Sequence, residues 1–163
     1  MLYYFPMAKG GGEKIIATNR QASHRFIILE KYEAGVVLEG PEVRSIRGGH
    51  ASIKESFCRV FKNEGWIINM HIPAWAHAGR EMDPMRMRKL LLHKAQLEKL
   101  IGAGTKKGFA LIPLRLYFKR GFVKVEIALC KGKQLYDKRQ DIKKRMHERE
   151  IARASVRKSK GKH

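Results

Sequence analysis

The side chains that most often bind metal ions or catalyse reactions are scattered along this sequence. His71, His77 and His93 lack the spacings that place two metal ligands on one face of a helix. The serines lie outside a nucleophile-elbow motif, and most acidic residues adjoin a cation in the chain. The glycine run at 10–12 lacks the spacing and the Ser or Thr of a phosphate-binding loop. The sequence therefore predicts no catalytic residue, no metal site and no cofactor.

Cationic side chains carry the stronger chemical signal. The 163 residues include 35 Lys and Arg against 15 Asp and Glu, a formal net charge of +20. So large an excess repels itself unless a polyanion neutralises it, and nucleic acid is the first partner to expect. Tyr117 and Phe118 precede Lys119 and Arg120. Because aromatic rings can stack on bases while cations bind phosphates, this interleaving favours RNA.

The charge is unevenly distributed, and this divides the chain. Residues 131–163 hold 13 cationic and 4 acidic side chains, nearly half of the net charge in about a fifth of the length. Apolar residues are sparse there, and they form no coherent stripe that would favour a membrane surface. We expect a flexible leader at 1–12, with translation beginning at Met7, a folded RNA-binding body at 13–130, and a basic C-terminal tail at 131–163.

The body has the pattern of short strands. Runs at 15–18, 25–29 and 35–38 are β-prone, with a turn expected at 32–35. Asn63-Glu64-Gly65 separates runs at 55–61 and 66–72, and Lys119-Arg120-Gly121 separates runs at 108–118 and 122–129, so two hairpins are predicted. Alternation of apolar and polar residues in the last run places one face in a core. Pro113 indicates an edge position or a bulge.

Two helices are predicted, at 42–47 and at 84–101. Pro41 and Gly48 delimit the first, and Asp83, Pro84 and Gly102 delimit the second. Short antiparallel strands crossed by two or three short helices favour a mainly β fold, an OB-like closed antiparallel barrel. A β-sandwich gives similar signals.

The tail is rich in helix formers but cannot cover a helix face against a core. Opposite charges recur at helical spacing, as in Asp141 and Arg145, yet each pair contributes only about 0.2–0.5 kcal/mol. We therefore expect the tail to be disordered when free and helical when bound to a polyanion. The two lone cysteines, Cys58 and Cys130, suit a reducing, cytoplasmic setting.

An ordered series of motifs covers nearly the whole chain. The motifs are IATNR at 16–20, YEAGVVL at 32–38, GPEVRSIRG at 40–48, DPMRMRKLLLHK at 83–94, VKVEIAL at 123–129, KGK at 131–133 and YDKR at 136–139. In this order and spacing the chain resembles the SsrA-binding protein family (small protein B, SmpB), the partner of transfer-messenger RNA.

The resemblance implies an OB-like barrel that binds the tRNA-like domain of transfer-messenger RNA and catalyses no reaction. The pair would enter ribosomes stalled on messages without a stop codon. The tail would then lie in the vacant messenger channel, at the decoding region of the small subunit, and license tagging. Elongation factor Tu would be a partner only indirectly, through the RNA. The protein would act as a monomer in the cytoplasm.

The resemblance also implies two sets of site residues. The RNA-binding set is Asn19, Arg20, His24, Glu33, Arg44, Arg47, Leu91 and Lys124. The ribosome-binding set in the tail is Lys131, Gly132, Lys133, Tyr136, Asp137, Lys138 and Arg139. Glu33 is unexpected on a basic face: it could accept hydrogen bonds from base amino groups or orient a neighbouring cation. Leu91 could shape the RNA surface or simply pack its helix.

Two other interpretations fit part of the pattern. A general OB-fold RNA-binding or ribosome-assembly protein would explain the charge and the barrel, but not the ordered motifs or the Asp-Lys-Arg after Tyr136. A metal-dependent nuclease would cleave RNA when a divalent metal is added.

Overall fold

The computed structural model describes residues 12–75, 81–104, 106–133, 142, 144, 146 and 147. The chain forms two compact units, Met1–Gly132 and Lys133–His163. In the second unit the described residues from 142 onward are helical, and their side chains are exposed. The predicted leader up to residue 11 and tail residues 134–141 lie outside the described residues, as does the proposed start at Met7.

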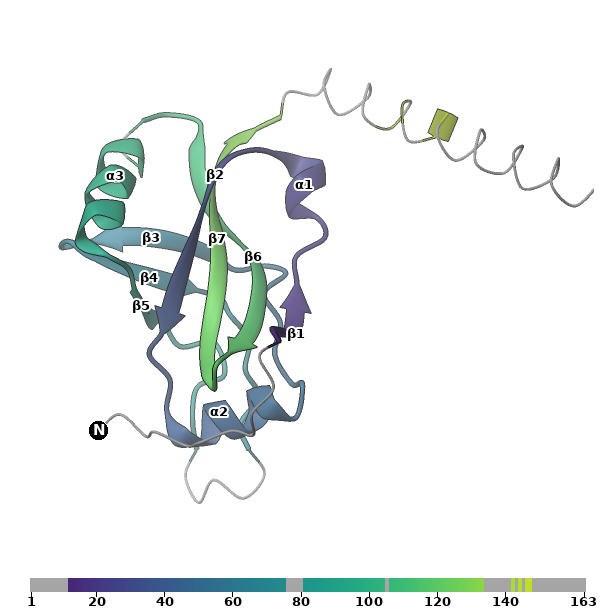
Figure 1. Cartoon of the computed structure of the whole chain (residues 1–163), viewed down its shortest axis with the longest axis vertical. Coiled ribbons are helices and arrows are strands. Elements are labelled where there is room, and N and C mark those ends of the chain that lie inside the picture. Colours follow the sequence, from purple (N-terminus) through teal and green to yellow (C-terminus); the bar gives the residue numbers. More distant parts are fainter. Residues whose placement is uncertain are drawn as a thin grey trace, which may run out of the picture. The chain divides into compact units, whose positions relative to one another are not determined.

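The described part of the first unit contains seven strands and three helices (Figure 1). In chain order they are β1 (Lys14–Thr18), α1 (Ala22–Arg25), β2 (Phe26–Val36), α2 (Gly40–Arg47), β3 (Phe57–Phe61), β4 (Glu64–Ile68), β5 (Arg88–Leu91), α3 (Lys94–Gly104), β6 (Phe109–Lys119) and β7 (Phe122–Gly132). The antiparallel sheet has the order β1-β6-β3-β4-β5-β2-β7, and pairing of β6 with β7 closes it into a ring. The prediction of a mainly β fold with a closed antiparallel sheet is therefore confirmed.

Both predicted hairpins are present, each with a two-residue turn. Lys62 and Asn63 have φ values of 49° and 57°, and Arg120 and Gly121 have values of 51° and 82°. Left-handed backbone at both turn positions matches the twist of the flanking strands. The first turn lies one residue earlier than expected, because Glu64 already pairs with Phe61.

The strands differ from prediction in two places. The expected turn at 32–35 is wrong: β2 runs without a break through Val36, paired with β7 along most of its length. The alternation of buried Tyr32 and Ala34 with exposed Glu33 is that of a strand. Pro113 lies in β6 where the register with β7 shifts, so the predicted bulge is confirmed.

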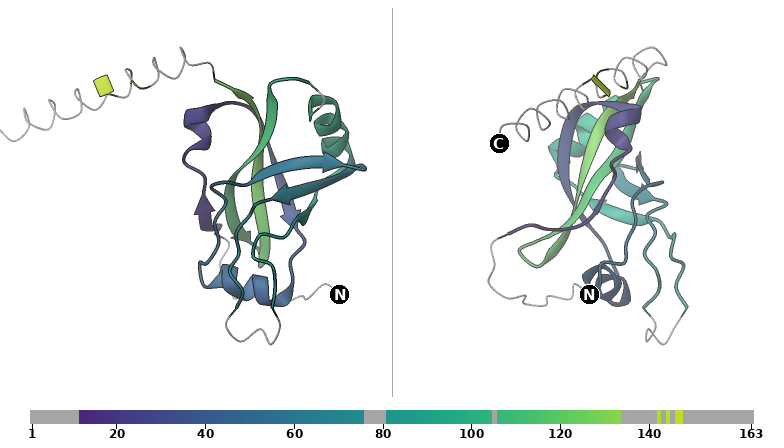
Figure 2. Two further views of the ribbon diagram at one scale, coloured as in Figure 1. Left: turned by 180° about the vertical axis from the view of Figure 1, so that it is seen from behind. Right: turned by 90° about the vertical axis from the view of Figure 1, so that its right-hand side faces the viewer.

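The short helix predicted at 42–47 is confirmed as α2. Pro41 stands in its first turn, and the backbone N–H of Glu39 donates to Glu42 Oε2 at 2.8 Å. The N–H of Gly48 bonds the carbonyl of Arg44 at 3.1 Å and ends the helix. Figures 1 and 2 show α2 at the end of the ring where the β6–β7 turn lies.

The long helix predicted at 84–101 is wrong in its first half. Asp83 Oδ1 accepts the N–H of Met85 at 2.8 Å in a local turn, and residues 88–91 form β5. Arg88 and Leu90 are buried while Leu91 is exposed, a strand alternation. The alternation is hard to read in the sequence because an arginine occupies an inward position. Only the second half, from Lys94, is helical.

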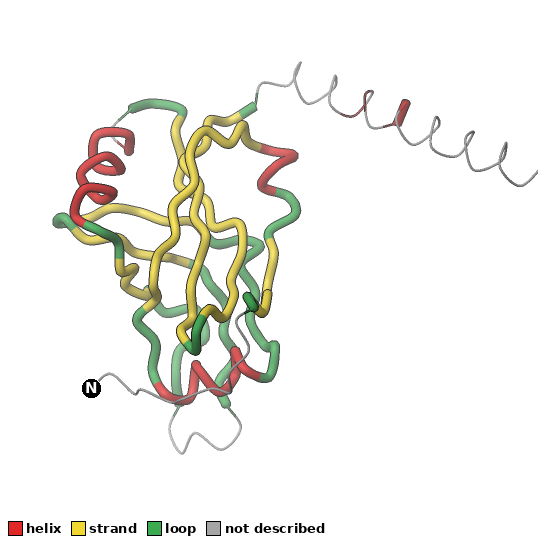
Figure 3. The backbone as a smooth tube through the Cα atoms, in the orientation of Figure 1, coloured by secondary structure: helices red, strands yellow, loops and turns green. Residues whose placement is uncertain are grey.

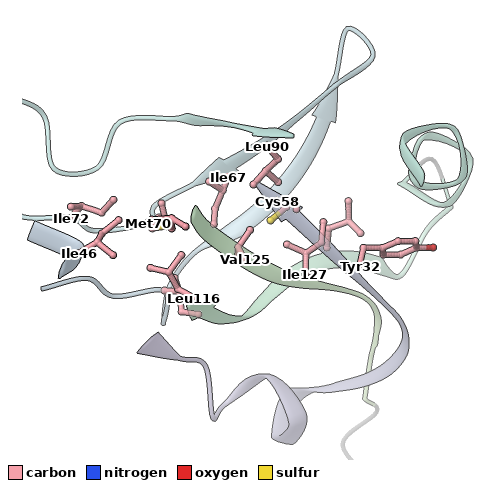
Figure 4. Packing of buried hydrophobic residues seen from close by; sticks show 14 of the residues in the cluster. Tyr32, Ile46, Cys58, Ile67, Met70, Ile72, Leu90, Leu116, Val125 and Ile127 are labelled. Atoms are coloured by element: carbon pink, nitrogen blue, oxygen red, sulfur yellow. The ribbon is translucent and has the colours of Figure 1, made fainter. Parts of the chain in front are cut away.

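The core fills the ring. Figure 4 shows buried side chains from several strands and from α2 converging there, among them Ile46, Ile67, Leu116, Val125 and Ile127. The tube view in Figure 3 shows strands forming the wall around this core. Cys58 belongs to it, and burial raises the pKa of its thiol well above the usual range. Burial also raises the pKa of Cys130 to about 11, so both thiols stay protonated.

A smaller apolar cluster lies on the other face of β6 and β7. Ala22 of α1 is 2% exposed and packs with Ile112, Leu114, Ala128 and Cys130. Alternation along β7 makes this geometry necessary, since Ile127 and Leu129 point into the ring and Ala128 and Cys130 point outward. The short helix α1 is thereby held on the outer face of the sheet.

Candidate nucleic-acid interface

One row of cross-strand neighbours crosses five strands. Gly35 of β2 pairs with Leu91 of β5 and with Lys124 of β7. Lys124 in turn pairs with Tyr117 of β6, which pairs with Ile15 of β1. Because paired residues project to the same face, these side chains share the outer face of the ring. Four strands that the sequence predicts, together with β5, therefore bring Lys124 and Leu91 into one row.

A second row lies next to the first. Glu33 of β2 pairs with Glu126 of β7, which pairs with Arg115 of β6, and Arg115 pairs with Thr18 of β1. Arg115 donates a hydrogen bond to Glu126 Oε2, and Lys31 Nζ lies 3.2 Å from Glu126 Oε1. Burial raises the pKa of Glu126, but the bonds from the two cations outweigh it and hold the pKa below its usual value.

Glu33 occupies the junction of the two rows. The Tyr117 hydroxyl donates to Glu33 Oε2 at 2.6 Å, and Lys119 Nζ donates to the same oxygen at 2.7 Å. These bonds, that of Lys119 first, lower the pKa of Glu33, and the nearby charge of Lys124 adds to the effect. The Arg115 guanidinium lies 5.7 Å from the centroid of the Tyr117 ring. Glu33 is thus a carboxylate that a tyrosine and a lysine hold in place on the outer face.

Asn19, Arg20 and His24 form a corner between β1 and α1. Asn19 is 7% exposed; its Nδ2 donates to Pro113 O at 3.3 Å, and its backbone N–H donates to Leu114 O at 2.8 Å. Asn19 therefore fixes the corner to β6, and its buried Oδ1 has no hydrogen-bond partner among the residues that the structure describes. Arg20 and His24 are exposed at this corner.

Leu91 does not lie in a helix, as the sequence predicts, but in a strand. It lies in strand β5 and is 51% exposed, so its predicted alternative role in helix packing is wrong. A Cβ on Gly35 would stand 3.3 Å from Leu91 Cβ and 3.4 Å from Leu91 Cδ1. The missing side chain at Gly35 lets Leu91 lie across the strand beside it.

Arg44 and Arg47 lie on α2, whose position depends on a buried ion-pair network. Glu42 is 4% exposed and accepts bonds from Arg88 Nε at 2.8 Å and from Arg86 Nε at 2.9 Å. Arg88 is fully buried and also bonds main-chain oxygens of the segment before β5. Arg44 itself is exposed, and Arg47 is partly buried. The two arginines stand outside the rows of paired strand residues.

The structure describes only part of the ribosome-binding set in the tail. Lys131 and Gly132 are exposed and form the end of β7, two residues beyond the expected end of the body. Lys133 is half-buried. Tyr136, Asp137, Lys138 and Arg139 lie outside the described residues. Within the described ranges there is no group of three or more side chains able to bind a metal ion, and no helix long and apolar enough to cross a membrane.

Sequence reasoning missed the residues that surround Glu33. Lys31, Arg115 and Glu126 were not singled out, and Tyr117 and Lys119 were noted only as an aromatic next to a cation. The sequence feature that could have indicated these residues is the two-residue alternation along 122–129, which places Lys124 and Glu126 on one face. Finding their partners needs the strand register, which joins Glu33 to a tyrosine 84 positions away.

This chain is similar in sequence to a family of known proteins. The family model described as "SmpB protein" matches residues 16–157. A protein named SsrA-binding protein from Bacillus cereus (strain AH820) is 51% identical over 149 residues, covering 91% of this chain and 96% of its own. The protein of the same name from Desulforudis audaxviator is 54% identical over 144 residues, covering 88% and 94%.

A solved structure is also similar. It is described as "tmRNA-SmpB: a journey to the center of the bacterial ribosome", and it superposes with a TM-score of 0.61 at 42% sequence identity. The match covers 72% of this chain and 84% of that one. The family model spans most of the chain, and both relatives exceed half identity over nearly their whole length. This chain belongs to the SmpB, or SsrA-binding protein, family.

Proposed function

We propose that this protein is the RNA-binding partner of transfer-messenger RNA in trans-translation, and that it catalyses no reaction itself. Family membership at 51–54% identity over about nine-tenths of the chain is the observation that carries the proposal. The ring is then an OB-like barrel, and its outer face binds the tRNA-like domain. The protein works as a cytoplasmic monomer that reaches elongation factor Tu only through the RNA.

The outer face has the chemistry that such a role needs. Lys124 and Lys119 can bind phosphates, while the exposed Leu91 offers apolar surface in the same row as Lys124. The corner with Arg20 and His24 extends the cationic surface beyond α1. We assign Asn19, Arg20, His24, Glu33, Leu91 and Lys124 to one continuous interface, and Arg44 and Arg47 of α2 to its margin.

The tail has a separate role in the proposal. Lys131, Gly132, Lys133, Tyr136, Asp137, Lys138 and Arg139 act on the ribosome, in the empty messenger channel at the small-subunit decoding region. The charge of residues 131–163 suits an RNA-lined channel, and opposite charges at helical spacing suit a segment that becomes helical on binding. The tail residues are therefore needed for tagging and not for the affinity of the barrel for the tRNA-like domain.

Competition binding tests the main proposal. The full chain should bind a fluorescent tRNA-like domain of transfer-messenger RNA and prefer it strongly over a generic RNA duplex of equal length. Sequencing of the RNA retained by the protein from a lysate should recover transfer-messenger RNA. Equal affinity for both RNAs would instead favour a general RNA-binding or ribosome-assembly protein. Cleavage of the RNA on adding a divalent metal would favour the nuclease.

The two roles are separated by variants. Lys124→Ala should weaken binding of the tRNA-like domain. Joint replacement of Asp137, Lys138 and Arg139 by alanine should leave that affinity unchanged but abolish tagging in a reconstituted translation system. Equal loss of RNA affinity in both variants would contradict the division between barrel and tail.

A further inference from the structure

The wall of the ring formed by β3, β4 and β5 has a cross-strand row of its own. Arg59 of β3 pairs with Trp66 of β4, and Trp66 pairs with Lys89 of β5. The residue that follows each of them in its strand packs in the core of the ring, so alternation turns the row to the outer surface. Figure 2 shows β3 and β4 crossing β6 and β7, so this wall faces a different direction from the rows around Glu33. An aromatic side chain thus lies between two cations.

Trp66 is not a core residue, although it is half-buried. It belongs neither to the apolar core of the ring nor to the smaller apolar cluster on β6 and β7. Within the described residues its indole N–H has no acceptor, and no cation lies over its ring. Arg59 is exposed and, in the same ranges, has no carboxylate partner. The indole and the guanidinium are therefore not committed to each other or to a neighbour.

A second aromatic side chain extends this surface along β3. Phe61 is 61% exposed, two residues from Arg59 on the same face, and Lys62 Nζ lies 5.3 Å from the centroid of its ring. The cross-strand partner of Phe61 is Glu64, two residues from Trp66, so the two aromatic residues are diagonal neighbours about 7–8 Å apart. Glu64 also holds Lys89 in an ion pair. Two rings at this spacing, with three cations around them, form what we call the β3–β5 platform.

From this arrangement we infer that the β3–β5 platform binds a single-stranded RNA segment, with bases stacked on Trp66 and Phe61 and phosphates bound by Arg59 and Lys89. Every base has a π face, and on other sheets a pair of aromatic side chains stacks successive bases in this way. The segment must be unpaired, because a duplex hides the faces of its bases. The inference goes beyond the proposed function, since it adds a second RNA contact that needs neither Glu33 nor Lys124.

Intrinsic fluorescence tests the stacking directly. The chain has two tryptophans, and Trp75→Phe leaves Trp66 as the only one. Hexaadenylate RNA is titrated into the full chain at low salt, and a base stacked on the indole should quench the emission of this variant. The matched control is Trp66→Phe, in which Trp75 is the only tryptophan and the emission should not respond. Quenching in the control alone would overturn the inference.

Matched variants separate stacking from general apolar contact. With fluorescein-labelled hexaadenylate in anisotropy titrations, Trp66→Ala and Phe61→Ala should each weaken binding about 5- to 150-fold, the range of base–aromatic stacking. Phe61→Tyr keeps a ring and should keep most of the affinity, whereas Phe61→Leu keeps apolar surface and should lose as much as Phe61→Ala. Because Phe61 is exposed, its variants decide the matter if Trp66→Ala folds poorly. Wild-type affinity in Phe61→Leu would overturn the inference.

The contribution of the cations is read from salt. Arg59→Ala should lower the slope of log affinity for the hexamer against log salt by about 0.7, the value for one phosphate contact to a single strand. Lys124→Ala should leave both the slope and the affinity for the hexamer unchanged. The reverse pattern, with the loss in Lys124→Ala, would place the hexamer on the outer face already described and overturn the inference.

Competition identifies the source of the segment. Protein saturated with the tRNA-like domain should still bind the labelled hexamer, and displacement by this domain alone would overturn the inference. Release of the hexamer by full-length transfer-messenger RNA assigns the segment to another part of that RNA, and release by ribosomal subunits assigns it to the ribosome; either supports the platform. Release by neither would overturn it. Failure of the wild type to bind the tRNA-like domain would refute the proposed function and leave the hexamer results standing.

Discussion

Arg88 is the side chain whose replacement should most weaken the fold. It is fully buried, donates from Nε to Glu42 at 2.8 Å, and bonds the main-chain oxygens of Met70 at 2.6 Å, Arg86 at 3.0 Å and Pro84 at 3.1 Å. The Arg88 guanidinium thereby joins α2 to the segments on either side of the gap in the described residues at 76–80. The substitution considered is Arg88→Met, which keeps most of the volume and removes the charge.

The expected cost follows from what the substitution leaves behind. Three carbonyl oxygens lose a donor, and within the described residues the buried carboxylate of Glu42 keeps only Arg86 and the N–H of Glu39 as donors. Removing one partner of a buried ion pair costs about 3–5 kcal/mol. At roughly 2.1 cal/mol/K per residue, the unit Met1–Gly132 unfolds with an entropy of about 0.28 kcal/mol/K. The melting temperature should therefore fall by about 11–18 °C.

Urea titration followed by circular dichroism measures the free energy, and calorimetry measures the melting temperature. The second arm combines Arg88→Met with Glu42→Gln, since glutamine can keep the hydrogen bond to the helix N-terminus. The double variant should lose about 1–3 kcal/mol less than the sum of the single variants, because removing one charge relieves the other. A loss below about 1 kcal/mol for Arg88→Met, or strict additivity, would refute the reasoning that this pair anchors α2.

Three further outcomes are expected. Gly35→Val should destabilise the protein and weaken binding of the tRNA-like domain more than Gly35→Ala, because the added methyl groups displace Leu91; equal effects in urea and anisotropy titrations would count against this contact. Lys124→Ala should lower the slope of log affinity against log salt by about one, while Arg59→Ala on β3 leaves it unchanged. Glu126 has a folded-state pKa below its unfolded value of about 4.3, so its stabilisation is present above that pH and is lost as the pH falls through the folded pKa. The urea midpoint should drop less steeply below pH 5 in Glu126→Gln than in the wild type, and an unchanged acid limb would contradict the assignment.

Much of the local structure could be predicted because short-range chemistry decides it. The two hairpins need left-handed turn residues, and Asn63 and Gly121 supply them. Pro41 and Gly48 delimit a helix by the same kind of local constraint. The prediction of a long helix was wrong around Arg88. In the sequence a buried arginine cannot be told from an exposed one, because its carboxylate partner lies 46 positions away.

The sequence by itself determined what kind of ligand this protein takes. Net charge, its concentration in residues 131–163 and an ordered set of motifs are properties of the chain, and they indicate both RNA as a ligand and the family. Only the tertiary structure decided how the charges are used. Strand register places Glu33, Tyr117 and Lys124 together, and it gives the neighbouring carboxylates of Glu33 and Glu126 different partners. The physical reason is range: turns and caps depend on neighbours in sequence, whereas a hydrogen bond across a sheet depends on which strands meet and in what register.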